Sequence, residues 1–185
     1  MSGNISLTRF HISHWNVSAV TVMTGAFKNK PAFNENINNW DVSKVTDMPE
    51  LFYGCTNFNQ PLNNWGVSKV TDMSELFYGC TIFNDAINNW NVSNVTNMSN
   101  MFYNCITFNQ PLNLWDVSNV TKMSNMFSGC NSLVQSFRMW TIISSNLTAM
   151  FFGTEVYPTT NGTNILINTA GTPTSNYFIG TSLIL

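Results

Sequence analysis

The chain has 185 residues, of which 44% are hydrophobic and only 9% are charged, and its formal net charge is −2. This composition excludes a basic nucleic-acid-binding surface, and the sequence has no run of about 18 apolar residues that would cross a membrane. An aromatic share of 14% favours one packed domain over a disordered, asparagine-rich tract.

Residues 1–10 are expected to form an N-terminal cap, because a stack of repeats exposes apolar core at its ends. The segment has no apolar stretch followed by a cleavage site, so we expect no secretory signal. The chain would then stay inside its cell or reach the surface by another route, for example on a particle. His11 and His14 have no carboxylate or cysteine near them in sequence, which favours a surface pair over a metal site.

Residues 11–154 are expected to form a repeat solenoid. The tryptophans recur every 25 residues, and the four cysteines keep the same period. A fixed period of this length is typical of stacked repeat arrays. The two columns consist of Trp15, Trp40, Trp65, Trp90, Trp115 and Trp140, and of Cys55, Cys80, Cys105 and Cys130.

The second half of each unit is predicted to be a short helix. Val70, Met73 and Phe77 recur at helical spacing and give one apolar stripe. Thr71 is predicted to cap the start of this helix, and Gly79 its end. Two turns are too short to be stable alone, so neighbouring coils would have to hold the helix in place.

The first half of each unit, residues 60–65, is predicted to be a short strand with Leu62 pointing inward. Stacked strands of this kind would form a parallel sheet with about 4.8 Å between coils. The predicted fold is therefore an α/β repeat solenoid with one short strand and one short helix per coil, a parallel sheet and capped ends.

Asparagines form columns of their own, which have two interpretations. They could make a regular ligand-binding face, or an internal ladder in which each amide bonds to loop backbone. The ladder is favoured for the column of Asn34, Asn59, Asn84 and Asn109, while the column of Asn38, Asn63, Asn88 and Asn113 is left open.

Other regular columns also suggest structural rather than chemical roles. The cysteines occupy one place in successive coils, which favours buried free thiols over disulfides, and no C-x-x-C pair suggests zinc. The threonine column is interpreted as helix caps. The Asp47 and Asp72 column continues as Asn97 and Lys122, which excludes a catalytic or calcium site there. The Asn-x-Ser/Thr sequons matter only if the chain enters a secretory pathway.

Residues 155–185 leave the repeat pattern and are expected to form a C-terminal cap. Residues 165–167 and 177–179 are predicted to be two strands, with a turn at residues 171–173 between them. The apolar end of this segment could also dock on a partner.

The unit from Phe58 to Phe77 resembles a known repeat. Its pattern, Phe-Asn-Gln-Pro-Leu-Asn-Asn-Trp-x-Val-Ser-x-Val-Thr-x-Met-Ser-x-Leu-Phe, is similar to the BspA-type leucine-rich repeat, also described as the DUF285 repeat. The resemblance covers roughly residues 8–154. It implies a leucine-rich-repeat-like solenoid and a role as a surface or adhesion protein of bacteria and protists. Large DNA viruses carry similar repeats. The family offers no catalytic residues and no cofactor to transfer.

These observations predict a non-enzymatic binding or adhesion module for a protein or glycan partner. No nucleophile motif, Walker A loop or dinucleotide fingerprint is present in the sequence. The alternative is a structural component of a virion or surface layer that self-associates. Specificity is expected at the variable positions, which are Asp41, Gly66, Asn91 and Asp116 in one column and Lys44, Lys69, Asn94 and Asn119 in another.

Overall fold

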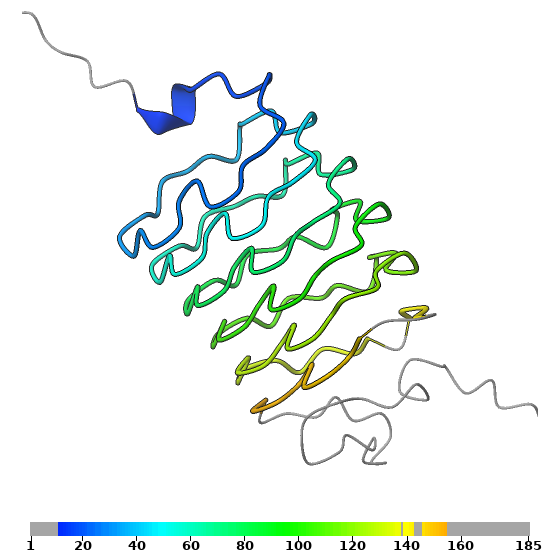
Figure 1. Cartoon of the computed structure of the whole chain (residues 1–185). Helices are drawn as coiled ribbons and strands as arrows, with labels where there is room; N and C mark the ends of the chain where they lie inside the picture. Colours follow the sequence, from blue (N-terminus) through cyan, green and yellow to red (C-terminus); the bar gives the residue numbers. More distant parts are fainter. Residues whose placement is uncertain (1–10, 138, 143–145, 155–185) are drawn as a thin grey trace, which may run out of the picture.

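The computed structural model describes residues 11–137, 139–142 and 146–154. Within these residues the chain winds through successive coils that stack on one another, from the blue coil to the orange one (Figure 1). One helix occurs in this part, the 3-10 helix η1, Ile12–His14. The predicted caps at residues 1–10 and 155–185, including the two strands, lie outside the described residues.

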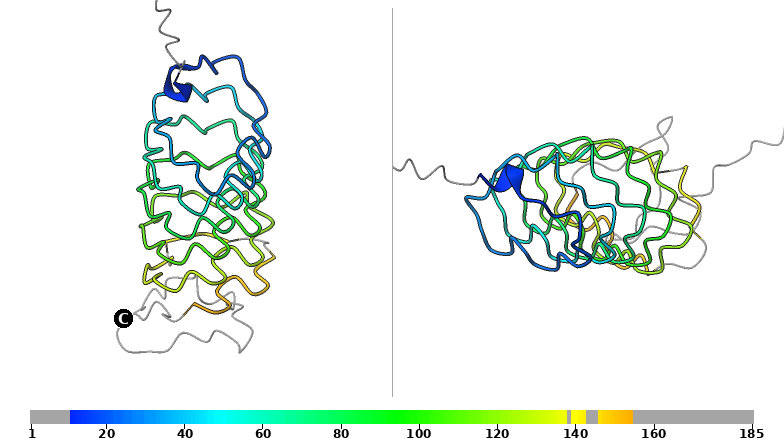
Figure 2. Two further views of the ribbon diagram at one scale, coloured as in Figure 1. Left: turned by 90° about the vertical axis from the view of Figure 1, so that its left-hand side faces the viewer. Right: turned by 90° about the horizontal axis from the view of Figure 1, so that it is seen from above.

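Neighbouring coils are in register at a step of 25 residues. The register is marked by isolated parallel bridges, one between each pair of coils, and the last bridge steps by 24 because one residue is deleted there. Figure 2 shows the same stack from the side and from above. The bridges join, in order, Val22, Asp47, Asp72, Asn97, Lys122 and Asn146.

Residues 71–80 and their equivalents, which we call the turn flank, fold as overlapping turns. Leu76 N–H donates to Met73 O at 3.3 Å, and Cys80 N–H donates to Phe77 O at 2.9 Å. The N–H groups that do not bond within these turns donate to carbonyls of the next coil. Phe77 N–H, for example, donates to Met101 O at 2.9 Å. Alternate residues therefore bond within their own coil and between coils.

A short helix was predicted for this segment, and the structure differs. Glu75 and Gly79 have φ of 58° and 69°, a backbone conformation that ends a right-handed helix. Positive φ at the third residue of a turn is typical of type II turns, which also explains why Gly suits residue 79. Thr71 caps no helix; its hydroxyl and N–H both donate to Thr46 O, at 3.3 and 2.8 Å.

Residues 57–70 and their equivalents, which we call the asparagine flank, contain no strand within the described part. Residues 63 and 64 form a turn, closed by Trp65 N–H donating to Leu62 O at 3.1 Å. The expected parallel pairing is instead reduced to the single bridges of the Asp72 column on the turn flank. The strand predicted at 60–65 does not form, because its backbone N–H groups donate to side chains of neighbouring coils. Leu62 N–H donates to Asp85 Oδ2, and Asn64 N–H donates to Asn38 Oδ1.

The core lies between the two flanks and is built from stacked aromatic rings. Phe52 and Phe77 stack at 5.6 Å between centroids, and Phe77 and Phe102 at 5.6 Å. A second phenylalanine column runs beside the first, with Phe83 4.0 Å from Phe77. Because each ring is sandwiched between rings of the coils above and below, one coil buries its apolar side chains only when neighbours are present.

Candidate functional site

The tryptophan column joins consecutive coils through its indoles. Trp65 Nε1 donates to Ile37 O at 3.1 Å, and Trp90 Nε1 to Leu62 O at 3.0 Å. The same bond recurs at Trp40, Trp115 and Trp140, all of which are buried. Trp15 is different, because 55% of its surface is exposed.

The cysteines are free thiols buried in the core. Cys105 Sγ donates to Phe77 O at 3.0 Å, and the other three cysteines make the same contact with the coil before theirs. Burial raises the pKa of Cys55 to about 11 and raises the pKa of Cys105 well above its ordinary value. A thiol held neutral in this way is a poor nucleophile and a poor metal ligand.

The asparagine column at position 59 is a ladder between coils. Asn59 Oδ1 accepts the backbone N–H of Asn84 at 2.9 Å, and Asn84 Oδ1 accepts that of Asn109 at 2.9 Å. Gln110 Nε2 adds a second donor to Asn84 Oδ1 at 3.2 Å. Asn34 begins the ladder, and Val134 N–H ends it on Asn109. These amides satisfy loop backbone and are not available to a ligand through these oxygens.

The column at position 63 also bonds between coils, although it is nearer to solvent. Asn38 Nδ2 donates to Asn63 Oδ1 at 2.9 Å, and Asn88 Nδ2 donates to Asn113 Oδ1 at 3.1 Å. Asn89 Nδ2, one residue further on, donates to Asn63 O at 2.7 Å. Amides in this part of the coil therefore alternate between bonding to each other and bonding to backbone.

The histidine pair is at the surface of the first coil. His11 Nε2 lies 2.8 Å from Glu35 Oε2, and both side chains are about half exposed. The ring centroids of His11 and His14 are 6.4 Å apart. The sequence did not suggest Glu35, because it comes from the following coil. Within the described residues no three groups from His, Cys, Asp and Glu are arranged to hold a metal ion.

A row of tyrosines on the turn flank is already occupied by the chain itself. Tyr53, Tyr78 and Tyr103 stack at 4.4 and 4.6 Å between centroids. Lys28 Nζ lies 4.8 Å from the centroid of the Tyr53 ring and pairs with Glu50. The stacked tyrosines therefore expose their ring edges to solvent, and Lys28 covers a face of the first ring, Tyr53.

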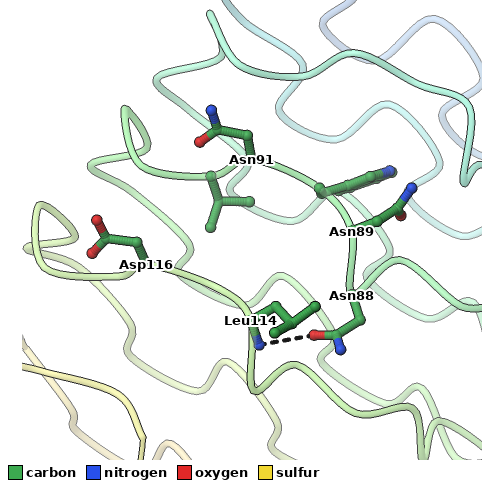
Figure 3. A pocket seen from close by; sticks show the side chains of 7 residues that line it. Asn88, Asn89, Asn91, Leu114 and Asp116 are labelled. Carbon is green, nitrogen blue, oxygen red and sulfur yellow. Dashed lines mark hydrogen bonds between the residues drawn. The ribbon is translucent and has the colours of Figure 1, made fainter.

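One open site with polar groups is a hollow of about 230 Å³ between two coils, which we call the Leu114 hollow (Figure 3). Buried Trp90 and Val92 line it, and so does Leu114, which is 69% exposed. Its polar lining consists of Asn88, Asn89, Asn91 and Asp116.

The hollow lies where the repeat departs from its own pattern. Leu114 occupies the column of Asn64 and Asn89, and it has no amide to donate to Asn88 O as Asn89 donates to Asn63 O. Its backbone N–H still donates to Asn88 Oδ1 at 3.0 Å (Figure 3). The next residue of this column, Met139, is 76% exposed, so an apolar edge continues from the hollow to the next coil.

The polar groups of the hollow offer both donors and acceptors. Asn91 Oδ1 accepts the N–H and hydroxyl of Ser93 at 3.2 and 2.8 Å, which leaves its Nδ2 without a partner among the described residues. The hydroxyl and backbone N–H of Ser118 hold the pKa of the Asp116 carboxyl below its usual range, so it is charged at neutral pH. Asn91 and Asp116 are also two of the variable positions noted in the sequence, and sequence reasoning did not connect them with Leu114.

Two residues of the second variable column bond to the preceding coil. Asn94 Nδ2 donates to Ser68 O at 2.7 Å, and Asn119 Nδ2 to Ser93 O at 2.8 Å. The corresponding residues of earlier coils, Lys44 and Lys69, are exposed.

A family model described as "Mycoplasma protein of unknown function, DUF285" matches residues 1–88 and 60–161. The chain belongs to this family. Comparison with curated proteins and with solved structures found no match. In the described part of the chain, no helix has the length and apolar character to span a membrane.

Proposed function

We propose that this DUF285 protein is a non-enzymatic binding module that presents the Leu114 hollow to a protein or glycan partner. The observation that carries the proposal is the combination, at variable positions, of an exposed leucine with a carboxylate and an amide whose Nδ2 has no partner in the described part of the chain. Binding sites commonly join an apolar contact with a few polar groups that fix orientation. Hydroxyl groups of a sugar or amides of a peptide would pair with Asn91 and Asp116, and an apolar face would lie on Leu114.

We also propose that the stacked coils are a solenoid of the BspA-type leucine-rich-repeat kind, with the surface or adhesion role that this resemblance implies. The ladders of Trp, Cys and Asn bonds that recur once per coil support this proposal. A rigid stack holds variable side chains at fixed spacing, which suits recognition of an extended partner.

The test is binding of the purified full chain to a glycan array and to proteins captured from its native setting. Leu114→Asn restores the residue of earlier coils and supplies a donor to Asn88 O, so it should weaken binding at least tenfold without unfolding the chain. Ile106→Thr is the matched control, since Ile106 is also exposed, at 43%, and also replaces the residue of earlier coils, Thr81. A chain that binds no partner saturably, or a partner lost equally with both variants, would contradict the proposal.

A further inference from the structure

The carboxylate of the Leu114 hollow has no counter-charge in the described part of the chain. The pKa of Asp41, in the same column, is lowered first by hydrogen bonds from Ser43 and then by the nearby cation of Lys44. The pKa of Asp116 is lowered by serine hydrogen bonds, and no described lysine adds to the effect. The two carboxylates therefore make similar local hydrogen bonds but differ in their surrounding charge.

The second variable column explains this difference. It carries exposed lysines in the earlier coils, at residues 44 and 69, and asparagines at residues 94 and 119 in the two coils that form the hollow. The acidic column returns at Asp116 after the basic column has ended. Negative charge is thus left uncompensated within the described residues at the place where Leu114 is 69% exposed.

The side chains that line the hollow offer mainly hydrogen-bond acceptors to a ligand. A carboxylate can accept about four hydrogen bonds, so the serine contacts do not saturate Asp116. Asn89 Nδ2 donates to Asn63 O at 2.7 Å, and no described residue donates to Asn89 Oδ1. Asn91 Nδ2 is a donor, since Oδ1 of the same amide accepts from Ser93. A ligand that donates several hydrogen bonds and carries positive charge is therefore favoured.

We propose that the Leu114 hollow binds an arginine side chain of a polypeptide partner, which gives a ligand class to the binding function proposed above and rests on it. A guanidinium is planar, always charged and carries five N–H donors, so it can bond to Asp116 and still donate to an amide oxygen. Its aliphatic stem would lie on Leu114, as the stems of basic side chains do on apolar surface. Asp116 and Leu114 belong to one coil and Asn89 to the coil before it, so the ligand bridges two coils (Figure 3).

A neutral glycan and a second copy of this chain match the charge of the hollow less well. Sugar hydroxyls would cover Asp116 without supplying a counter-charge, and a charge that leaves water without a partner is costly. The chain has nine acidic residues against seven lysines and arginines, and its described part contains no arginine. Charge complementarity therefore favours a basic partner over another copy.

The probe is a tripeptide, Gly-Arg-Gly, with both ends capped so that the guanidinium is its one charge. Added at millimolar concentration to the ¹⁵N-labelled full chain, it should shift the amide signals of Leu114 and Asp116 saturably. The same tripeptide with citrulline in place of arginine keeps the shape but has no charge, and should bind about tenfold more weakly. High salt should also weaken binding of the arginine peptide, because it screens exposed charges.

A matched pair of variants tests the location. Asp116→Asn removes the charge and keeps an acceptor for the serine, as Asn91 does naturally, and should weaken binding of the arginine peptide about tenfold. Asp41→Asn removes the same charge from the same column outside the lining and should leave binding unchanged. Unchanged amide signals in the other coils show that both variants are folded. Equal binding by the two variants, or equal binding of the arginine and citrulline peptides, would overturn the inference.

Two other occupants are tested in parallel, and either would overturn the inference. Glucosamine that binds as tightly as the arginine peptide, and more weakly to Asp116→Asn, would assign the hollow to an amino sugar. Self-association that is lost with Asp116→Asn would assign it to a second copy.

The native partner separates this inference from the proposed function. Loss of that partner with Leu114→Asn but not with Asp116→Asn would overturn the arginine assignment and leave the binding function of the hollow standing. A native partner retained by both variants would overturn both.

Discussion

The two flanks of each coil are joined to their neighbours by different chemistry. On the turn flank, backbone meets backbone, as when Phe77 N–H donates to Met101 O at 2.9 Å. On the asparagine flank beyond its first residue, backbone meets side chain, as when Asn109 N–H donates to Asn84 Oδ1 at 2.9 Å. One flank therefore depends on the path of the chain and the other on the identity of particular residues.

This difference explains which columns vary along the chain. On the turn flank, Asp72 is followed by Asn97 and then Lys122 without any break in the parallel bridges. On the asparagine flank, the ladder keeps Asn from Asn34 to Asn109, and a change from Asn64 and Asn89 to Leu114 opens a hollow. Variation on the asparagine flank thus changes the shape of the surface, which is why we place recognition there.

The largest expected effect comes from the core that both flanks share. Phe77→Ala should lower the free energy of unfolding by about 3–5 kcal/mol, because it removes a fully buried ring stacked against both neighbouring coils. Phe27→Ala is the matched control. Phe27 is only partly buried in the first coil and stacks on Phe52 alone within its column, so its loss should be smaller. Urea titration measures both, and equal losses would mean that the coils do not depend on their neighbours.

The next prediction compares the flanks directly. Asn84→Ala removes the acceptor of Asn109 N–H and should cost about 1–3 kcal/mol, the penalty of leaving a partly buried donor unpaired. Thr96→Val, on the turn flank, removes a hydroxyl that donates to Thr71 O at 3.2 Å. Because Thr96 N–H still donates to that carbonyl at 2.9 Å, we expect a loss below about 0.5 kcal/mol.

Asn84→Asp sharpens this comparison, because a carboxylate can still accept both bonds. It should keep most of the stability that Asn84→Ala loses, as measured by urea titration at neutral pH. A loss for Thr96→Val as large as that for Asn84→Ala would remove the distinction between the flanks.

The sequence predicted the columns better than the backbone between them. The period and the inward-facing residues follow from side-chain identity alone, as at Trp65 and Phe77, both of which are buried. The short helix predicted between Thr71 and Gly79 was wrong because periodicity cannot show that alternate N–H groups bond to the next coil. The Leu114 hollow was missed because it is lined by residues 88–92 of one coil and by Leu114 and Asp116 of the next, which meet only across coils. The one available signal was the break of an asparagine column at Leu114.

Two glycines should respond to substitution with opposite signs. Gly66 has ordinary φ, and an added Cβ would meet only Ser43 Cβ at 3.8 Å. From Asn16 to Asp116 the other residues of its column are Asp or Asn and accept a serine N–H two residues on, as Asp41 does from Ser43 at 3.0 Å. Gly66→Asp should therefore raise the free energy of unfolding by about 0.5–1 kcal/mol, by restricting the unfolded chain and adding this bond.

Gly79→Ala, on the turn flank, should lower the free energy of unfolding by about 1–2 kcal/mol, because Gly79 has φ of 69°. Thermal and urea unfolding of the two variants measure the signs. If Gly79→Ala stabilised the chain, the turns of this flank could change conformation, which would contradict the fixed backbone hydrogen bonds between coils.

The smallest expected effect is a loss of stability in acid that arises from two carboxyls of the asparagine flank. Hydrogen bonds from Ser43 and Ser118 hold the pKa values of the Asp41 and Asp116 carboxyls below their usual range. A lowered pKa in the folded chain contributes stability that is present above the unfolded value, about 3.9, and is lost as pH falls through the folded value. The chain should therefore lose a small part of its stability below about pH 4. The double variant Asp41→Asn and Asp116→Asn keeps both acceptors, as Asn91 does naturally, and should lose less between pH 6 and pH 3. Parallel falls in the urea midpoints of the two chains over this range would show that these serine contacts do not act on the carboxylates in solution. Side-chain charge would then matter as little to the asparagine flank as it does to the column of Asp72, Asn97 and Lys122 on the turn flank.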